Sequence, residues 1–271
     1  MFEDFFALHT TPFTREIDAA SLFLTSTHRE GLARLRYTVE RRQIMLLTGE
    51  TGAGKSTLLG AFNAQLDPTR YEAIYLCQTG ATVGSILHEI LRQLRVDPPY
   101  GITRAKALVA RTISSRQQSQ KRIVVLLVDE AENLSEAVLE TLRGLATTEF
   151  DAFSPLALIL SGQRHLATRL AMANLQPLAG RINLRYHLRA FSEEESADYT
   201  QHHLQRAGAE NEIFTQPALE RIHKASGGVP RRINQLATLS LMSAASSETK
   251  LVDDQLIDEV IHCEGLEAEA S

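Results

Sequence analysis

The chain has 271 residues, of which 44% are hydrophobic and 23% charged, and its formal net charge at pH 7 is −5. This composition can bury a sizeable core, which excludes a disordered or fibrous protein. Its longest apolar runs, such as residues 123–128, are far shorter than the roughly 20 residues that cross a bilayer, and the N-terminus lacks the basic start of a signal peptide. The only two cysteines, Cys77 and Cys263, show no metal-binding spacing, so we expect a reducing, cytoplasmic location.

The charges are unevenly distributed along the chain. Residues 191–271 hold 6 Lys and Arg against 15 Asp and Glu, whereas residues 1–190 hold 22 against 18. A polyanionic partner therefore fits the first part of the chain and not the second. The arginines that favour it cluster in one short stretch, although each also fits the solvated face of an ordinary helix: Arg29, Arg34, Arg36, Arg41 and Arg42.

Strands alternate with helices over the first 190 residues. Apolar runs predict five strands, and helical periodicity predicts helices between and before them. Because each strand is a nearly continuous apolar run, the pattern predicts an α/β fold with a parallel sheet that helices cover on both faces. The strands are expected at 44–48, 71–77, 123–128, 156–160 and 182–188, and the helices at 28–42, from Lys55, and at 82–95, 104–117 and 135–145.

Only helices are predicted after Phe191. Residues 192–195 form a capping box, Thr215 precedes a proline at a helix start, Pro230 opens a third helix, and Asp253 caps a fourth that ends near Cys263. We therefore predict an α/β core at 1–190, which includes an N-terminal lead-in and helix at 1–42. A small all-helical lid follows at 191–263, and a flexible tail at 264–271.

Residues 49–56 match the pattern G-x4-G-K-[ST] in full. The match follows a buried strand and opens a helix, which is the context that a phosphate-binding loop requires. Its backbone N–H groups and the helix dipole would point at phosphate, Lys55 would reach the β- and γ-phosphates, and Ser56 would ligate Mg²⁺. The residues predicted to hold ATP here are Gly49, Glu50, Thr51, Gly52, Ala53, Gly54, Lys55, Ser56 and Thr57.

Two acids follow the apolar strand at 123–128. We expect this strand next to the phosphate loop, with Asp129 holding Mg²⁺ through water and Glu130 polarising the attacking water. The second acid favours an ATPase over a kinase or a pure switch.

Further polar residues are candidates for completing the site. Ser161 or Gln163, at the end of the strand at 156–160, is expected to sense the γ-phosphate or the attacking water. Arg231 and Arg232 lie in the first turn of a helix, where a cation is unfavourable unless an anion is near, so Arg231, or alternatively Arg232, is expected to contact ATP phosphate. Arg181 is either a finger that acts on a neighbouring subunit's ATP or a surface arginine.

These motifs together resemble the ExeA/general-secretion-A group of AAA+ ATPases, which belongs to a wider set with the transposition-associated (TnsC/IstB-like) ATPases. The resemblance covers nearly the whole chain. It implies that Pro12, Phe13 and His28 pack near the adenine, and that ATP promotes assembly into rings or filaments. Ser161 departs from the group's usual pattern. The resemblance rests on residues 5–8, 12–15, 22–23, 28, 47–50, 128–134, 160–163, 181–188 and 228–234.

The resemblance implies an enzyme that converts ATP and water to ADP and phosphate as a conformational switch, with Mg²⁺. The stand-alone form and the lead-in at 12–15 and 34–37 are similar to ATPases encoded beside transposases, so the favoured role is an ATP-dependent, duplex-DNA-binding regulator of a transposase or integrase. The alternative is an ExeA/MshM-like cytoplasmic ATPase that assists type II secretion or pilus assembly.

Overall fold

The computed structural model describes residues 2–14, 22–77, 80–147 and 154–265, which fall into two compact units. The α/β unit comprises Ser26–Thr51 and Lys55–Leu188, and the helical unit comprises Met1–Thr25, Gly52–Gly54 and Arg189–Ser271. This division differs from the predicted one, which placed residues 1–25 with the α/β core. Arg15 of the lead-in and residues 266–271 of the predicted tail lie outside the described residues.

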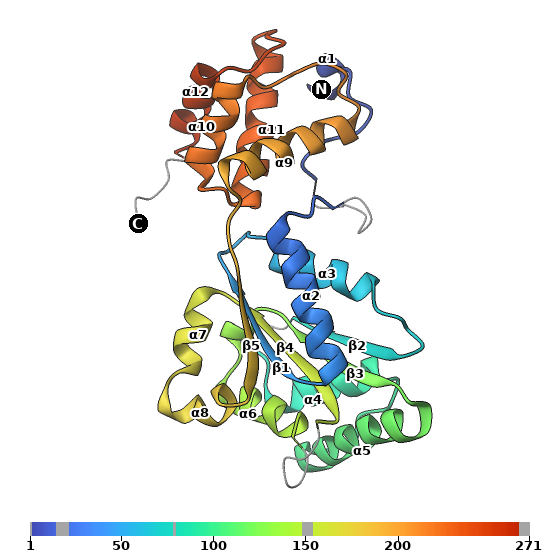
Figure 1. Ribbon diagram of the computed structural model, residues 1–271. Helices are drawn as coiled ribbons and strands as arrows, with labels where there is room; N and C mark the ends of the chain where they lie inside the picture. Colours follow the sequence, from blue (N-terminus) through green and yellow to red (C-terminus); the bar gives the residue numbers. More distant parts are fainter. Residues whose placement is uncertain (1, 15–21, 78–79, 148–153, 266–271) are drawn as a thin grey trace. The chain divides into compact units, whose positions relative to one another are not determined.

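The α/β unit is built on a five-stranded parallel sheet in the order β2-β3-β4-β1-β5 (Figure 1). All five predicted strands are confirmed, but the acidic strand β3 does not lie beside β1, because β4 separates them. An apolar run marks a strand without specifying its neighbours, so the sequence pattern could not order them. The strands are β1 (Ile44–Gly49), β2 (Tyr71–Leu76), β3 (Ile123–Val128), β4 (Leu156–Gly162) and β5 (Ile182–Leu188).

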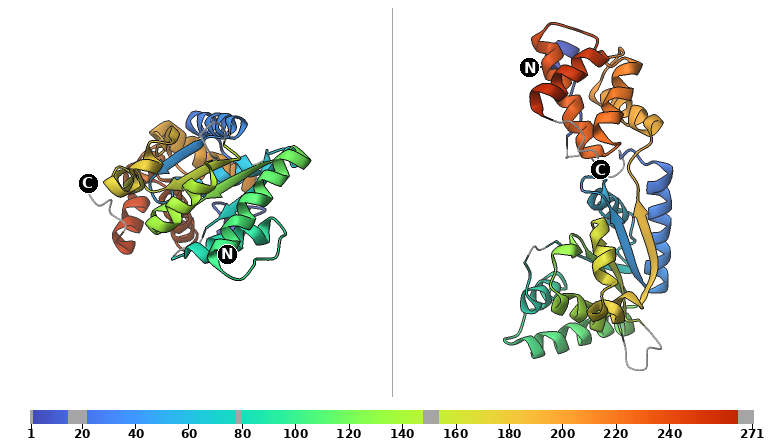
Figure 2. Two further views of the ribbon diagram at one scale, coloured as in Figure 1. Left: turned by 90° about the horizontal axis from the view of Figure 1, so that it is seen from below. Right: turned by 90° about the vertical axis from the view of Figure 1, so that its left-hand side faces the viewer.

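Helices cover both faces of this sheet (Figure 2). Alternate strand residues such as Leu46, Leu126 and Leu158 share one apolar cluster with helices α4 to α8, whereas Met45 and Ile159 are buried on the opposite face. The predicted two-sided α/β architecture is therefore confirmed. On one face lie α2 (Ser26–Arg41) and α3 (Lys55–Ala64), and on the other α4 (Val83–Gln93), α5 (Ile102–Gln120), α6 (Glu136–Leu145), α7 (Arg164–Leu170) and α8 (Gln176–Ala179). The short helices α7 and α8 were not predicted.

The helical unit packs around an apolar cluster of its own. The buried side chains of Phe2, Phe6, Leu8 and Phe13 belong to this cluster, which is why the N-terminal residues group with the helices that end the chain. The capping box is confirmed, since the Ser192 side chain accepts from the backbone N–H of Glu195. The helices are α1 (Phe2–Phe6), α9 (Glu193–Ala207), α10 (Gln216–Ser226), α11 (Pro230–Ser246) and α12 (Asp254–Glu264). Across the described parts of both units, no helix has the length and apolarity needed to span a membrane.

His203 holds the N-terminal segment within the helical unit. The backbone N–H of Phe13 donates to His203 Nδ1 at 3.3 Å, and the two rings stack with centroids 5.2 Å apart. Phe13 has a left-handed φ of 59°, a conformation that is rare for a bulky residue and that the stack and the hydrogen bond support. The His203 side chain is almost fully buried, and this burial lowers its pKa to about 4, with smaller contributions from His202 and Arg206.

We expect the helical unit to lose stability as the pH falls from about 6.5 to about 4, because over this range the unfolded chain binds a proton at His203 that the native state does not. Above about pH 6.5 both states are neutral at this residue and the effect disappears. From pH 7.5 to pH 4.5 the free energy of unfolding should fall by about 2 kcal/mol less in His203→Gln than in the wild type. Urea unfolding followed by circular dichroism at the two pH values measures it. His202→Gln, at a half-buried neighbour, is the control and should behave as wild type; an equal loss in both variants would contradict the assignment.

Candidate active site

Most of the predicted site residues of the α/β unit gather at the carboxyl edge of its sheet. The loop of residues 49–54 joins the end of β1 to the start of α3, and Asp129 follows β3. Ser161 lies near the carboxyl end of β4, where it pairs with Leu47 of β1. The carboxyl ends of parallel strands share one edge, where open α/β sheets bind their ligands. Figure 1 shows β1, β3 and β4 ending on this side.

The loop after β1 has the backbone of a phosphate cradle. Gly52 and Gly54 have φ values of 86° and 94°, which glycine adopts without steric cost. The Lys55 ammonium donates to the carbonyl oxygens of Gly49 at 3.0 Å and Glu50 at 2.9 Å, so it lies over the loop. The exposed Ser56 lies in the first turn of α3, at a helix N-terminus, where anions are stabilised. The neighbouring Thr57 is exposed in the same turn.

Asp129 is buried, with 3% of its surface exposed, and three donors fix its carboxylate. Oδ1 accepts from Ser161 Oγ at 2.8 Å and from the backbone N–H of Glu130 at 3.0 Å, while Oδ2 accepts from Tyr75 Oη at 3.0 Å. Burial, together with the Asp129 carboxylate, raises the pKa of Tyr75, so its hydroxyl stays a neutral donor. Burial likewise raises the pKa of the nearby Cys77 thiol, with the charges of Glu130 and Asp129 adding to it. One carboxylate is thus held in a single orientation.

Glu130 differs from its neighbour in both exposure and backbone. Its side chain is exposed, and its φ of 51° and ψ of 38° are left-handed, which costs a residue with a side chain on the order of 1 kcal/mol. Asn133 Nδ2 donates to Glu130 Oε2 at 3.4 Å. The arrangement places an exposed carboxylate beside a buried, oriented one, and strained conformations of this kind concentrate at functional sites.

The structure separates the two candidates at the end of β4. Ser161 is fully buried and donates its hydroxyl to Asp129. Gln163 is half-buried, and it stands at the N-cap of α7 without a capping hydrogen bond from its side chain. Ser161 therefore orients the acid, and Gln163 remains the candidate for contact with a bound ligand.

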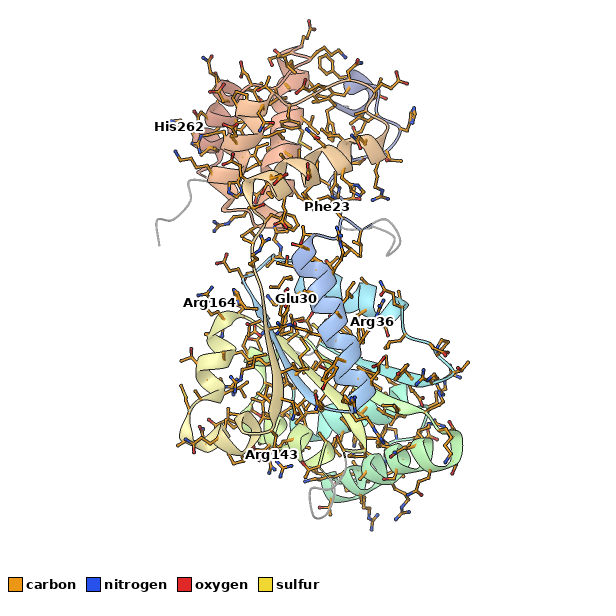
Figure 3. The ribbon with its side chains drawn as sticks, in the orientation of Figure 1. Phe23, Glu30, Arg36, Arg143, Arg164 and His262 are labelled. Atoms are coloured by element: carbon orange, nitrogen blue, oxygen red, sulfur yellow. The ribbon has the colours of Figure 1, made fainter. Side chains whose placement is uncertain are left out.

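Three further polar residues at this edge were not predicted. Thr48 Oγ1 lies 3.0 Å from His187 Nδ1, and Arg164 Nη2 lies 3.2 Å from His187 Nε2. Burial and the charge of Arg164 lower the pKa of His187, so the ring is neutral near pH 7. Figure 3 labels Arg164 at the start of α7. The pairing of β1 with β4 and β5 brings these residues together. The sequence alone shows only that each lies near the carboxyl end of a predicted strand, which is a weak signal for a site residue.

Arg181 lies away from these residues, whereas Arg231 contacts the phosphate loop: its backbone N–H donates to the carbonyl oxygen of Gly52 at 3.4 Å. Arg181 stands just before β5, at the amino edge of the sheet, and its Nη1 donates to Thr147 Oγ1 at 3.3 Å. The length of β5, roughly 20 Å, separates it from the loop of its own chain. Arg231 and Arg232 are exposed in the first turn of α11, in the helical unit. Their roles toward ATP stay predictions.

Arginines of the cluster at 29–42 take intrachain contacts. Arg34 forms an ion pair with Glu30 at 2.6 Å, Arg36 donates to Gln65, and the Arg41 guanidinium lies 5.8 Å from the centre of the Tyr37 ring. Figure 3 labels Glu30 and Arg36 on α2. Three of the five arginines therefore have partners within the chain, and their presence does not by itself require a polyanionic ligand.

The oxygen ligands available at the edge suit Mg²⁺. Over residues 2–14, 22–77, 80–147 and 154–265, no group of three or more His, Cys, Asp and Glu side chains could hold a metal by itself. Mg²⁺ is usually bound by one or two carboxylates, hydroxyls and substrate phosphates rather than by an all-protein cage. Asp129 and Ser56 offer this partial donor set, which fits a metal that arrives with a nucleotide.

Residues 37–170 match a family model described as AAA domain. That stretch includes the phosphate loop and strands β1 to β4, so it is an AAA domain with the P-loop ATPase fold. General secretion pathway protein A of Aeromonas hydrophila is a homologue, 36% identical over 247 residues, which are 90% of this chain and 45% of that protein. The predicted fold and the resemblance to the general-secretion-A group are confirmed, and the chain spans about half the length of this relative.

Solved structures share the fold at low sequence identity. The Aeropyrum pernix ORC2 protein superposes with a TM-score of 0.70 at 14% identity, covering 96% of this chain and 72% of that one. Drosophila ORC bound to DNA gives 0.64 at 17%, covering 96% and 64%, and the Thermotoga maritima RuvB Holliday junction branch migration motor gives 0.53 at 18%, covering 87% and 69%. At these identities the likeness establishes architecture alone.

We expect Ser161→Ala to raise the Mg²⁺ concentration that half-saturates nucleotide binding by about tenfold, because it removes one charge-assisted hydrogen bond that orients Asp129, worth about 1.5 kcal/mol. Titrating Mg²⁺ against a fluorescent ATP analogue measures the shift. The matched control is Ser240→Ala, which removes another fully buried serine hydroxyl, one that donates to the Leu236 carbonyl in the helical unit. Equal Mg²⁺ curves for the two variants would rule out the positioning role.

Proposed function

We propose that this protein binds ATP with Mg²⁺ at the carboxyl edge of the sheet and hydrolyses it to ADP and phosphate. The observation that carries the proposal is the pair of acids after β3. One is buried and oriented by three donors, and the other is exposed beside it, at the edge that also holds the phosphate loop. The confirmed AAA domain supports nucleotide chemistry at this edge.

Each residue of the site has a role in this proposal. The backbone N–H groups of residues 49–56 and Lys55 bind the β- and γ-phosphates. Ser56 and Asp129 hold Mg²⁺, which when bound neutralises charge on the phosphate oxygens. Glu130 orients the attacking water and accepts its proton, because its carboxylate is exposed, whereas three donors already engage the buried carboxylate of Asp129. Gln163 contacts the γ-phosphate or this water.

We expect Glu130→Gln to bind ATP as the wild type does and to hydrolyse it at least about 100-fold more slowly, because the amide cannot accept a proton. A steady-state phosphate-release assay and filter binding of labelled ATP measure the two properties. Lys55→Ala should instead lose ATP binding, since it removes the cation over the loop.

The neighbouring acid provides the matched control for this substitution. Glu132→Gln makes the same change two residues further on, at a half-buried position in the short turn after Glu130, and it should hydrolyse ATP within a few-fold of the wild-type rate. Normal hydrolysis by Glu130→Gln would show that another group is the base.

We further propose that the ATP-bound protein assembles into a ring or filament in which Arg181 acts on a neighbour's ATP. The place of Arg181 at the amino edge, remote from its own phosphate loop, is compatible with action in trans only. Arg231 would complete the site from the helical unit.

The role we propose is that of a cytoplasmic ATPase assisting type II secretion or pilus assembly. Its support is the 36% identity to General secretion pathway protein A, although the chain covers only 45% of that protein. Regulation of a transposase on duplex DNA is the second candidate. It rests on the lead-in and the basic balance of the first 190 residues, and the intrachain contacts of Arg34, Arg36 and Arg41 weaken the contribution of that cluster.

We expect the ATP-trapped Glu130→Gln protein, cross-linked in cells of its own host, to co-purify with secretion or pilus proteins of the envelope, identified by mass spectrometry. Lys55→Ala, which should not enter the ATP state, is the control and should recover less of them. Recovery of a transposase or integrase in their place would transfer the assignment to the second candidate. The genes that flank the coding sequence are an independent check.

A further inference from the structure

The segment that contains α5 is strongly basic. Residues 98–128 hold six cations, Arg104, Lys106, Arg111, Arg116, Lys121 and Arg122, and no Asp or Glu. The helix itself contributes four of them over its 19 residues. The segment has no carboxylate of its own to neutralise these cations, so any partner of theirs comes from another element or from another molecule.

Internal partners account for two of these cations. Arg116 donates to the carbonyl oxygen of Leu94 at 2.8 Å and forms an ion pair with Glu72 at 3.1 Å, and Arg122 also approaches Glu72, at 3.5 Å. Both therefore belong to the packing of α5 against the sheet. The remaining cations of the segment are exposed.

The outer face of α5 forms a continuous stripe. Ala105, Val109 and Ile113 are the buried residues of the helix and mark its inner face. Arg104, Arg111 and Gln118 are seven residues apart from one to the next and exposed, and the exposed Ala107 and Ser115 lie between them on the side opposite the buried face. The stripe extends about 21 Å along the helix. Its small residues, Ala107 and Ser115, leave room for a ligand to come close to the helix beside the arginines.

At its carboxyl end the stripe reaches a basic cavity. This cavity, of about 390 Å³, is lined by Arg42, Gln117, Gln118, Lys121 and Ile123. Gln118 belongs to both the stripe and the cavity, and the polar side chains of the lining are cations and amides, which donate hydrogen bonds to anions.

Two of the lining residues have a backbone that normally favours glycine. Arg42, after the end of α2, and Lys121, the C-cap of α5, have φ values of 53° and 56°. Glycine is the usual residue in a left-handed helix cap, because a side chain there is strained. Both positions carry a long cation that lines the same cavity, whereas Arg95, which has a similar φ of 59°, does not line it.

We propose that the outer face of α5, from Arg104 to the cavity at Lys121 and Arg42, is a docking surface for the phosphate backbone of duplex DNA. The surface carries a run of cations without carboxylates, which matches a polyanion. Its length suits successive phosphates along a duplex. From Arg104 to Lys121 no aromatic side chain is present on which the bases of a single strand would stack, and the exposed Tyr100 precedes the helix. The surface lies in the α/β unit, remote from the phosphate loop, so DNA binding to it does not depend on ATP hydrolysis.

The test is the salt dependence of DNA binding by the full-length protein. Fluorescence anisotropy with a labelled 30-base-pair duplex at about 50 to 200 mM salt compares the wild type with Arg104→Gln/Arg111→Gln. The double variant should bind about tenfold more weakly at the low-salt end, and the slope of log K against log salt should fall by about 2, one unit for each phosphate that the protein no longer neutralises. Lys121→Gln should lower this slope by about 1.

A matched control removes two exposed cations from the helical unit. Arg206→Gln/Lys224→Gln changes the net charge by the same amount and should bind DNA within about twofold of the wild type. If both double variants lose the same affinity for DNA, the effect is one of net charge and the proposal is overturned. It is also overturned if Arg104→Gln/Arg111→Gln binds DNA as tightly as the wild type. No measurable binding by the wild type, or tighter binding to a single strand of the same length or to polyglutamate, would also overturn it. Thermal unfolding confirms that the variants fold, and their ATPase rates, which should be unchanged, separate this proposal from that of hydrolysis.

Discussion

The orientation of the Asp129 carboxylate is the constraint on which the candidate site depends. Its three donors come from three places: Tyr75 from β2, Ser161 from β4 and the backbone of Glu130 from the turn after β3. A buried carboxylate is costly unless donors compensate it, so the same hydrogen bonds that stabilise the sheet edge also fix the acid. Because β4 lies between β3 and β1, Ser161 links the acidic strand to the strand that ends in the phosphate loop.

Backbone strain in the α/β unit is found both at this edge and at the opposite one. Glu130 has a left-handed backbone at the carboxyl edge, and Arg42 and Lys121 have it at the cavity near the amino ends of β1 and β3. A residue with a side chain occupies such a conformation at a cost of about 1 kcal/mol, which tightly packed neighbouring elements must offset. Strand β4, which is fully buried, and strand β3, which is buried apart from its first residue Ile123, supply that support, since their apolar residues are packed on both faces.

Burial of apolar side chains joins the N-terminal segment to the helical unit. Aromatic residues near the start of the chain complete a core that the helices after Arg189 share, and His203 joins them through a hydrogen bond that needs a neutral ring. The sequence showed the aromatic lead-in and the lid separately. Their association joins parts about 190 residues apart, and neither periodicity nor spacing carries information over that distance.

The sequence by itself determined the strands, the longer helices and the chemistry of single motifs. Apolar runs located all five strands, and the phosphate loop and the acids at Asp129 and Glu130 were found because consecutive residues create them. The tertiary structure decided what depends on strand order and register: that β4 separates the acid from the loop, that Ser161 bonds to Asp129 while Gln163 does not cap its helix, and that Tyr75, Arg164 and His187 reach the same edge. A period of two or 3.6 residues encodes which side of an element is buried, whereas lateral neighbours are set by the packing of the whole sheet.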